Sequence, residues 1–96
     1  MVKLESVVRA MDGVHKYKAT FVQEDGRKKT TYFGLLGASD YTIHKDIERR
    51  DRYRARHAKD LDTGDPTRAG YLSYYILWNL PTFAASLADY RQRFDL

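Results

Sequence analysis

Cationic side chains recur at helical spacing in residues 39–61, the longest stretch without glycine or proline, which contains five arginines. On a helix with about 100° per residue, five cations share one face. They are Lys45, Arg49, Arg52, Arg56 and Lys59. Guanidinium and ammonium groups in such a row suit the phosphates of a nucleic-acid backbone. This stripe predicts nucleic-acid binding, without chemistry and with little sequence preference.

The same row also fits a solvated helix surface. Glu48 precedes Arg52 by four residues, and Asp60 follows Arg56 by four, so both arginines have a potential ion-pair partner on the helix. Both interpretations stay open at the level of sequence.

A second set of polar residues, Arg50, Arg54 and His57, falls on the helix face that also carries Ile43 and Ile47. Buried guanidinium groups need a carboxylate or carbonyl partner. One hypothesis is an anion pocket completed by a phosphate or a partner's carboxylate. The other is an internal salt bridge, or long stems that pass an apolar surface to reach solvent.

The residues that could support catalysis or metal binding are few. Asp40, His44 and Glu48 have the spacing of a helical metal site, but we expect Asp40 to cap the helix instead. There is no phosphate-binding glycine loop, nucleophile elbow or zinc-finger spacing. The sequence therefore predicts a non-enzymatic protein with no metal and no cofactor.

Aromatic residues are unusually many, with eight tyrosines and four phenylalanines. Four of the aromatic residues crowd one predicted helix: Tyr71, Tyr74, Tyr75 and Trp78. They predict either core packing or a partner-binding surface, because tyrosine and tryptophan are enriched at protein interfaces.

The elements that position these residues form a single α+β domain over residues 1–96. Residues 1–34 alternate apolar and polar side chains around two Asp-Gly pairs, at Asp12 and Asp25. Asp-Gly is typical of type I′ hairpin turns, so we expect a short three-stranded antiparallel sheet with Leu4 and Val8 on one side.

About three helices should follow and pack on the sheet. The first is the arginine-rich helix at 39–61. Residues 65–94 should form a helical hairpin, with one helix from Pro66 to Trp78 and another from Thr82 to Phe94.

The overall composition narrows the class of protein. The net charge of +4 suits nucleic acid, an anionic surface or an acidic protein. No cysteine, no signal peptide and no apolar run of membrane-spanning length are present. We therefore expect an intracellular protein without a membrane partner.

From the arginine-rich segment onward, the sequence resembles a group of small, basic, uncharacterised proteins of large DNA viruses of eukaryotes. The shared motifs are Ser39-Asp40-Tyr41, His44-Lys45-Asp46, Arg49-Arg50, Tyr53, Arg56-His57, Ala69-Gly70, Leu77-Trp78-Asn79 and Pro81-Thr82. The resemblance covers roughly residues 34 to 94. In the loop at Asp62-Thr63-Gly64 the chain departs from the group, whose members tend to carry an aromatic residue there.

This group has no established activity, so the resemblance implies a viral origin and supplies no catalytic residues. Together with the cationic stripe, it predicts a nucleic-acid-binding protein with DNA as the expected partner, in the host cytoplasm or nucleus or in the virion. The alternative is a structural module, a minor virion component that binds another virion protein or itself through the aromatic helix.

Overall fold

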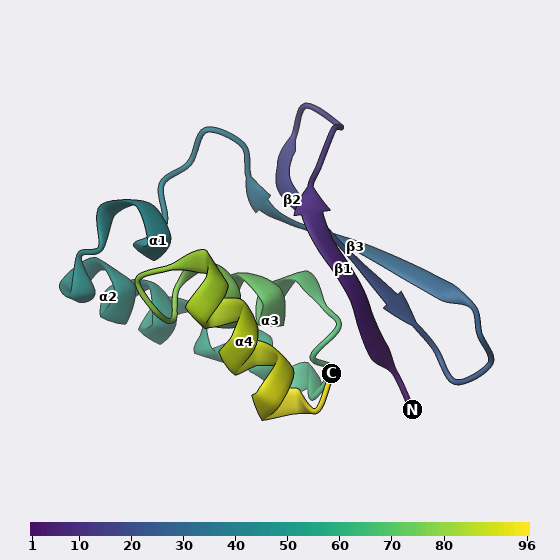
Figure 1. The fold of residues 1–96 in the computed structure, drawn as a ribbon. Helices are drawn as coiled ribbons and strands as arrows, with labels where there is room; N and C mark the ends of the chain where they lie inside the picture. Colours follow the sequence, from purple (N-terminus) through teal and green to yellow (C-terminus); the bar gives the residue numbers. More distant parts are fainter.

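The chain folds into a three-stranded antiparallel sheet with its helices gathered to one side (Figure 1). The computed structural model describes all 96 residues. The strands are β1 (Lys3–Arg9), β2 (His15–Val22) and β3 (Lys28–Leu35), paired in the order β1-β2-β3. The predicted α+β class and N-terminal sheet are confirmed.

The turn between β2 and β3 is wider than the type I′ turn predicted for Asp25-Gly26. The Gln23 amide donates to the Arg27 carbonyl at 2.8 Å, and the Gly26 amide donates to the Gln23 carbonyl at 2.9 Å. Only Gly26 has a positive φ, of 84°. This is the three-residue hairpin loop in which a type I turn precedes a left-handed residue, the conformation that glycine adopts without strain.

A bulge in β1 places Leu4 and Val8 on opposite sides of the sheet, so the prediction that they share one side is wrong. The pairing with β2 shifts between Leu4 and Ser6, which leaves Glu5 as an extra residue. Side chains alternate between the two faces of a strand, so one inserted residue moves every later side chain of β1 to the opposite face. Leu4 is buried and Val7 packs against the core, whereas Val8 is 47% exposed.

The hydrophobic core lies between the sheet and the C-terminal helices. Its eight buried residues are Leu4, Ala19, Phe21, Phe33, Leu72, Ile76, Leu77 and Tyr90. Residues 39–61 contribute none of them, so the sheet and the C-terminal part of the chain form the stable centre. The arginine-rich segment is added to its surface.

The arginine-rich segment forms three short helices instead of the single helix predicted over 39–61. They are α1 (Tyr41–His44), α2 (Ile47–His57) and η1 (Ala58–Thr63), the last a 3₁₀ helix. Lys45 ends α1 in a left-handed conformation with a φ of 55°. Asp46 then caps α2, accepting hydrogen bonds from the amides at the helix start.

A buried ion pair joins this segment to the sheet. The Lys16 ammonium of β2 donates to Asp40 Oδ2, and Asp40 is only 2% exposed. The other carboxylate oxygen, Oδ1, accepts from the Thr42 amide at 2.9 Å. Asp40 therefore caps α1, as predicted, and at the same time neutralises a buried lysine, which makes the burial of both charges tolerable.

The C-terminal third is one irregular helix followed by one regular helix. α3 (Ala69–Leu72) continues into a π-helical segment, η2 (Ser73–Leu77), and α4 (Phe83–Phe94) packs beside it. Helix formation begins later than the predicted Pro66, because the Asp65 carboxylate accepts from the Thr67 amide and closes a turn there. Thr82 caps α4, which confirms the predicted start of that helix. None of the helices has the length and apolar character needed to cross a membrane.

Tyr90 supplies a test of this packing. Its ring is fully buried, its hydroxyl donates to the Pro66 carbonyl, and burial raises the pKa of that hydroxyl. Tyr90→Phe should lower the free energy of unfolding by about 1–2 kcal/mol, because the part-buried Pro66 carbonyl loses its donor. Urea unfolding followed by circular dichroism measures this loss.

Tyr32→Phe is the matched control, since Tyr32 lies on β3 and is 41% exposed. This control should leave the unfolding midpoint within experimental error of the wild type. Equal stability of the Tyr90 variant and the control would contradict a structural role for the Tyr90 hydroxyl.

Candidate nucleic-acid interface

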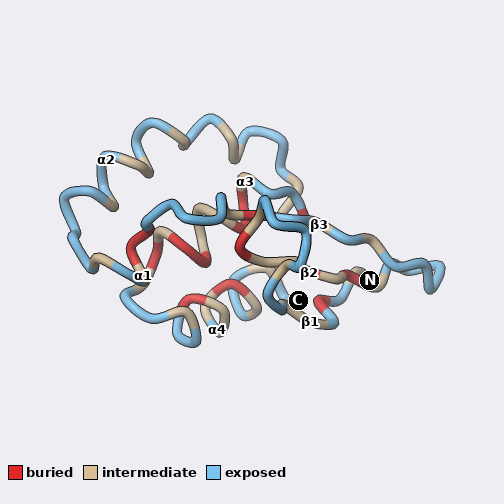
Figure 2. Tube along the Cα trace, turned by 90° about the horizontal axis from the view of Figure 1, so that it is seen from above, coloured by how far each residue is buried: buried red, intermediate tan, exposed pale blue.

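α2 runs along the outside of the molecule and has no buried residue (Figure 2). The prediction that Ile43 and Ile47 share one helix face with Arg50, Arg54 and His57 is wrong. Ile43 is 61% exposed and Ile47 is 53% exposed, because the left-handed turn at Lys45 separates them onto two helices with different axes. Contacts of polar and aromatic side chains, rather than an apolar face, attach α2 to the rest of the chain.

A stack of rings forms the first of these contacts. Tyr53 of α2 lies parallel to Trp78, with ring centroids 4.2 Å apart and an interplanar angle of 5°. His57 stacks on the other side of Tyr53, at 4.1 Å. Burial within this stack raises the pKa of Tyr53. The stack fixes the rotation of α2 about its axis.

Arg54 forms the second contact. Its Nη1 donates to the Trp78 carbonyl at 3.0 Å and to Asn79 Oδ1 at 3.3 Å. Its guanidinium lies 4.2 Å from the centre of the Tyr74 ring, within the range of a cation–π interaction. Carbonyls at the end of a helix lack hydrogen-bond donors within the helix, and Arg54 supplies a donor to the Trp78 carbonyl.

Arg50 forms the third contact, one helical turn earlier. Its Nη1 donates to the Asn79 carbonyl at 3.1 Å, and its Nη2 donates to Asp51 at 2.8 Å. Beyond the stack, His57 pairs with Asp60 at 3.0 Å. Arg50, Arg54 and His57 therefore have partners within the chain and do not surround a common cavity.

The outward side of α2 carries Arg49, Arg52 and Arg56, which we call the α2 cationic face. All three are exposed. Two of the acids close to them have other partners, since Asp51 pairs with Arg50 and Asp60 pairs with His57. The third, Glu48, is exposed and forms no ion pair. The ion pairs considered from spacing, Glu48 with Arg52 and Asp60 with Arg56, do not form. These three guanidinium groups keep their donors for solvent or a ligand.

The two lysines of the predicted stripe lie off this face. Lys45, in the left-handed turn, donates from Nζ to the Pro81 carbonyl at 2.7 Å and to the Thr42 carbonyl at 3.1 Å. Lys59 lies in η1, where it lines a separate groove.

The four aromatic residues proposed as a partner-binding surface have contacts within the chain. Tyr71 is buried and donates its hydroxyl to the Leu61 carbonyl at 2.6 Å. Tyr75 packs edge-on against Phe94. Tyr74 lies beneath Arg54, and Trp78 is part of the ring stack with Tyr53.

The residues whose spacing suggested a metal site make separate contacts in the structure. Asp40 is occupied by Lys16 and by the cap of α1. His44 Nδ1 accepts from the Asp46 amide at 2.9 Å, and its other ring nitrogen, Nε2, is buried without a partner. The chain contains no group of three or more acidic or histidine side chains arranged to hold a metal ion.

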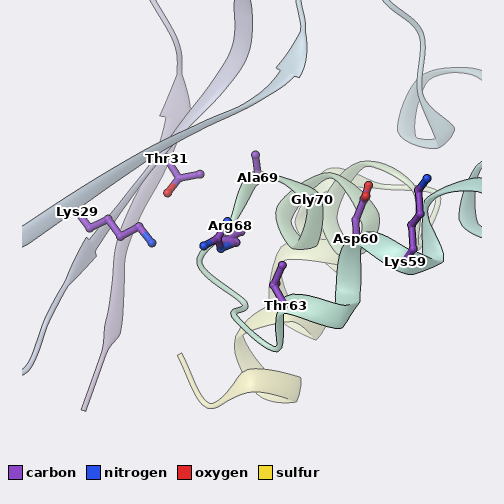
Figure 3. Close-up of a pocket in the computed structure, with 8 residues that line it drawn as sticks. All are labelled: Lys29, Thr31, Lys59, Asp60, Thr63, Arg68, Ala69 and Gly70. Carbon is purple, nitrogen blue, oxygen red and sulfur yellow. The ribbon is translucent and has the colours of Figure 1, made fainter.

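Sequence reasoning missed a groove between β3 and the η1–α3 region, shown in Figure 3. Its lining includes three cations, Lys29, Lys59 and Arg68. Lys29 lies on β3, Lys59 in η1 and Arg68 just before α3, so no regular spacing marks the set. Two hydrogen bonds hold the two sides of the groove together: Thr31 Oγ1 to the Thr67 carbonyl and Lys29 Nζ to Thr67 Oγ1, both at 2.8 Å.

Comparison with known proteins assigns a family to the chain. Residues 6–57, more than half of the sequence, match a family described as a family of unknown function (DUF5754). The chain belongs to this family. The match begins within β1 and ends with α2, whereas the resemblance seen in the sequence began at residue 34. Comparison with curated proteins and with solved structures finds no match.

Replacing Arg54 tests its internal role. Arg54→Ala should destabilise the fold by about 1–3 kcal/mol, because the Trp78 carbonyl and the Tyr74 ring lose their cationic partner. Arg52→Ala removes the same side chain from the outward side of α2 and should change stability by less than about 0.5 kcal/mol. Urea unfolding of both variants measures the difference. Equal stabilities would contradict the assignment of Arg54 as a structural residue.

His44 predicts a dependence of stability on pH. Burial of the ring, together with the positive charge of Arg49, lowers the pKa of His44 below its ordinary value of 6.5. Between the two pKa values the unfolded chain binds more protons than the folded chain, so stability is lost as the pH falls through this window.

His44→Asn keeps an acceptor for the Asp46 amide but removes the titrating ring. The free energy of unfolding should therefore decrease less between pH 7 and pH 5 in this variant than in the wild type. Chemical denaturation at a series of pH values provides the measurement. Parallel curves for the two proteins would show that His44 does not contribute.

Proposed function

We propose that this protein binds nucleic acid, with DNA as the expected partner, by docking the α2 cationic face on the phosphate backbone. The observation that carries the proposal is that Arg49, Arg52 and Arg56 are exposed and form no ion pair within the chain, while Asp51 and Asp60 pair with other residues. Arginine is suited to this task because its planar fork donates two hydrogen bonds to one phosphate.

The position of these arginines favours binding to the backbone over reading of bases. From Arg49 to Arg56 the helix rises about 10 Å, so the three guanidinium groups form one short row. The residues between Arg49 and Arg56 include no asparagine or glutamine, the side chains that read adenine. We therefore expect docking without chemistry and with little preference among sequences.

The proposal includes a viral setting. The motifs shared with small basic proteins of large DNA viruses, such as His44-Lys45-Asp46 and Leu77-Trp78-Asn79, support an origin in such a virus. In that setting, the protein would be packaged with the genome or act on it in the host cytoplasm or nucleus.

Fluorescence anisotropy with labelled duplex DNA, single-stranded DNA and RNA, at several salt concentrations, tests the proposal. The wild type should bind, with a log–log salt slope of several charges. The triple variant Arg49→Ala, Arg52→Ala, Arg56→Ala should bind more weakly and lower the slope by about three, one for each lost phosphate contact.

The matched control replaces three cations remote from α2, by Lys3→Ala, Lys18→Ala and Arg27→Ala. This variant has the same net charge as the triple variant, so it separates the α2 cationic face from a general effect of charge. It should keep most of the wild-type affinity. Equal losses in both variants, or no binding by folded wild type at low salt, would overturn the proposal.

A further inference from the structure

The groove beside β3 has a size and a lining that set it apart from the rest of the surface. It has a volume of about 740 Å³. One wall comes from β3, and η1 and α3 supply the other side (Figure 3). The lining residues are Lys29, Thr31, Lys59, Asp60, Thr63, Arg68, Ala69 and Gly70. Only one of them is hydrophobic and none is aromatic, so the groove offers cationic and hydroxyl groups and no ring on which a ligand could stack.

The charges along the groove are unbalanced. Its single carboxylate, Asp60, is the partner of His57. Lys59 forms no ion pair, since the acid next to it is the one that faces His57. The remaining two cations, Lys29 and Arg68, share one carboxylate, that of Asp65. The lining therefore has more positive charge than its own acids neutralise.

Lys29 and Arg68 keep hydrogen-bond donors free. Their nitrogens lie 3.8 Å and 3.7 Å from Asp65 Oδ2, longer than a charge-assisted hydrogen bond of about 2.8 Å. Asp65 uses its other oxygen, Oδ1, to accept from the amide and hydroxyl of Thr67. Lys29 gives one of its three N–H groups to Thr67 Oγ1. The other donors of both side chains are available to a ligand.

Close packing fixes the η1 side of the groove. A Cβ atom added at Gly70 would lie 2.9 Å from the Cβ of Asp60, so only glycine lets α3 approach η1 this closely. The hydroxyl oxygen of Thr63 accepts from the Asp65 amide at 3.3 Å, which leaves its proton free to donate. Close packing thus fixes the backbone of η1 and α3 beside the groove, while the side chains of Lys59 and Arg68 are exposed.

We propose that this groove binds an oligophosphate, a chain of linked phosphates carried free or on a nucleotide. Three cations distributed around 740 Å³ match several anionic groups rather than one. Arginine and lysine together bind phosphate oxygens by a planar fork and a point charge. The lack of an aromatic lining means that a base would add little. The groove can bind this ligand whether or not α2 binds nucleic acid.

Isothermal titration calorimetry of the full chain with inorganic triphosphate tests the proposal. Wild type should bind one triphosphate, and the variant Lys59→Gln, Arg68→Gln should bind about tenfold more weakly, because two charge-assisted contacts are lost. The control Lys3→Gln, Arg27→Gln loses the same charge elsewhere and should change affinity by less than about twofold.

Titration with ATP distinguishes the two sources of an oligophosphate. Affinities that agree within about threefold for ATP and triphosphate would indicate a free chain, and tighter binding of ATP would indicate a nucleotide. Absence of binding by the wild type, or equal losses in the groove variant and the control, would overturn the proposal.

Amide chemical shifts of the wild type provide a measurement that depends on no variant. On addition of triphosphate, the largest shifts should occur at Lys29, Lys59, Thr63 and Arg68. Shifts concentrated instead at Arg49, Arg52 and Arg56 would assign the ligand to the α2 cationic face and would overturn the groove proposal.

Discussion

Hydrogen bonds from two arginines to the end of the π-helical segment hold α2 in place. Arg50 and Arg54 donate to the carbonyls of Asn79 and Trp78, and Tyr53 stacks on the Trp78 ring between them. Carbonyls at a helix end need donors, and guanidinium groups need acceptors when partly buried. Each side satisfies the other, so a helix without a buried residue keeps a defined orientation.

This arrangement divides the cations of α2 into two sets with different roles. The inward arginines use their donors on backbone carbonyls, while Arg49, Arg52 and Arg56 remain exposed on the other side. The direction of the outward set depends on the inward set, because both are on one rigid helix. The cationic groove beside β3 depends on different contacts, those of Thr67 with Lys29 and Thr31.

Local sequence signals predicted the fold class and several boundaries, because the physical cause was local. Thr82 caps α4, and Gly26 closes the turn between β2 and β3. The failures required contacts between distant residues or rare backbone conformations. Nothing in the sequence marks the left-handed turn at Lys45 or the bulge at Glu5. The sequence predicts that Arg50 and Arg54 need partners within the chain. It does not show that these partners are the carbonyls of Asn79 and Trp78, which lie more than twenty positions away.

The lack of any buried residue in α2 has a consequence for the dynamics of the chain. Detaching this helix would uncover the Trp78 ring and two backbone carbonyls but none of the eight core residues, so the free energy of such a local opening should be below that of global unfolding. α2 would then act as a separate cooperative unit, whose amides exchange with solvent long before those of β2. A ligand that holds the helix in place would slow this exchange without touching the hydrophobic core.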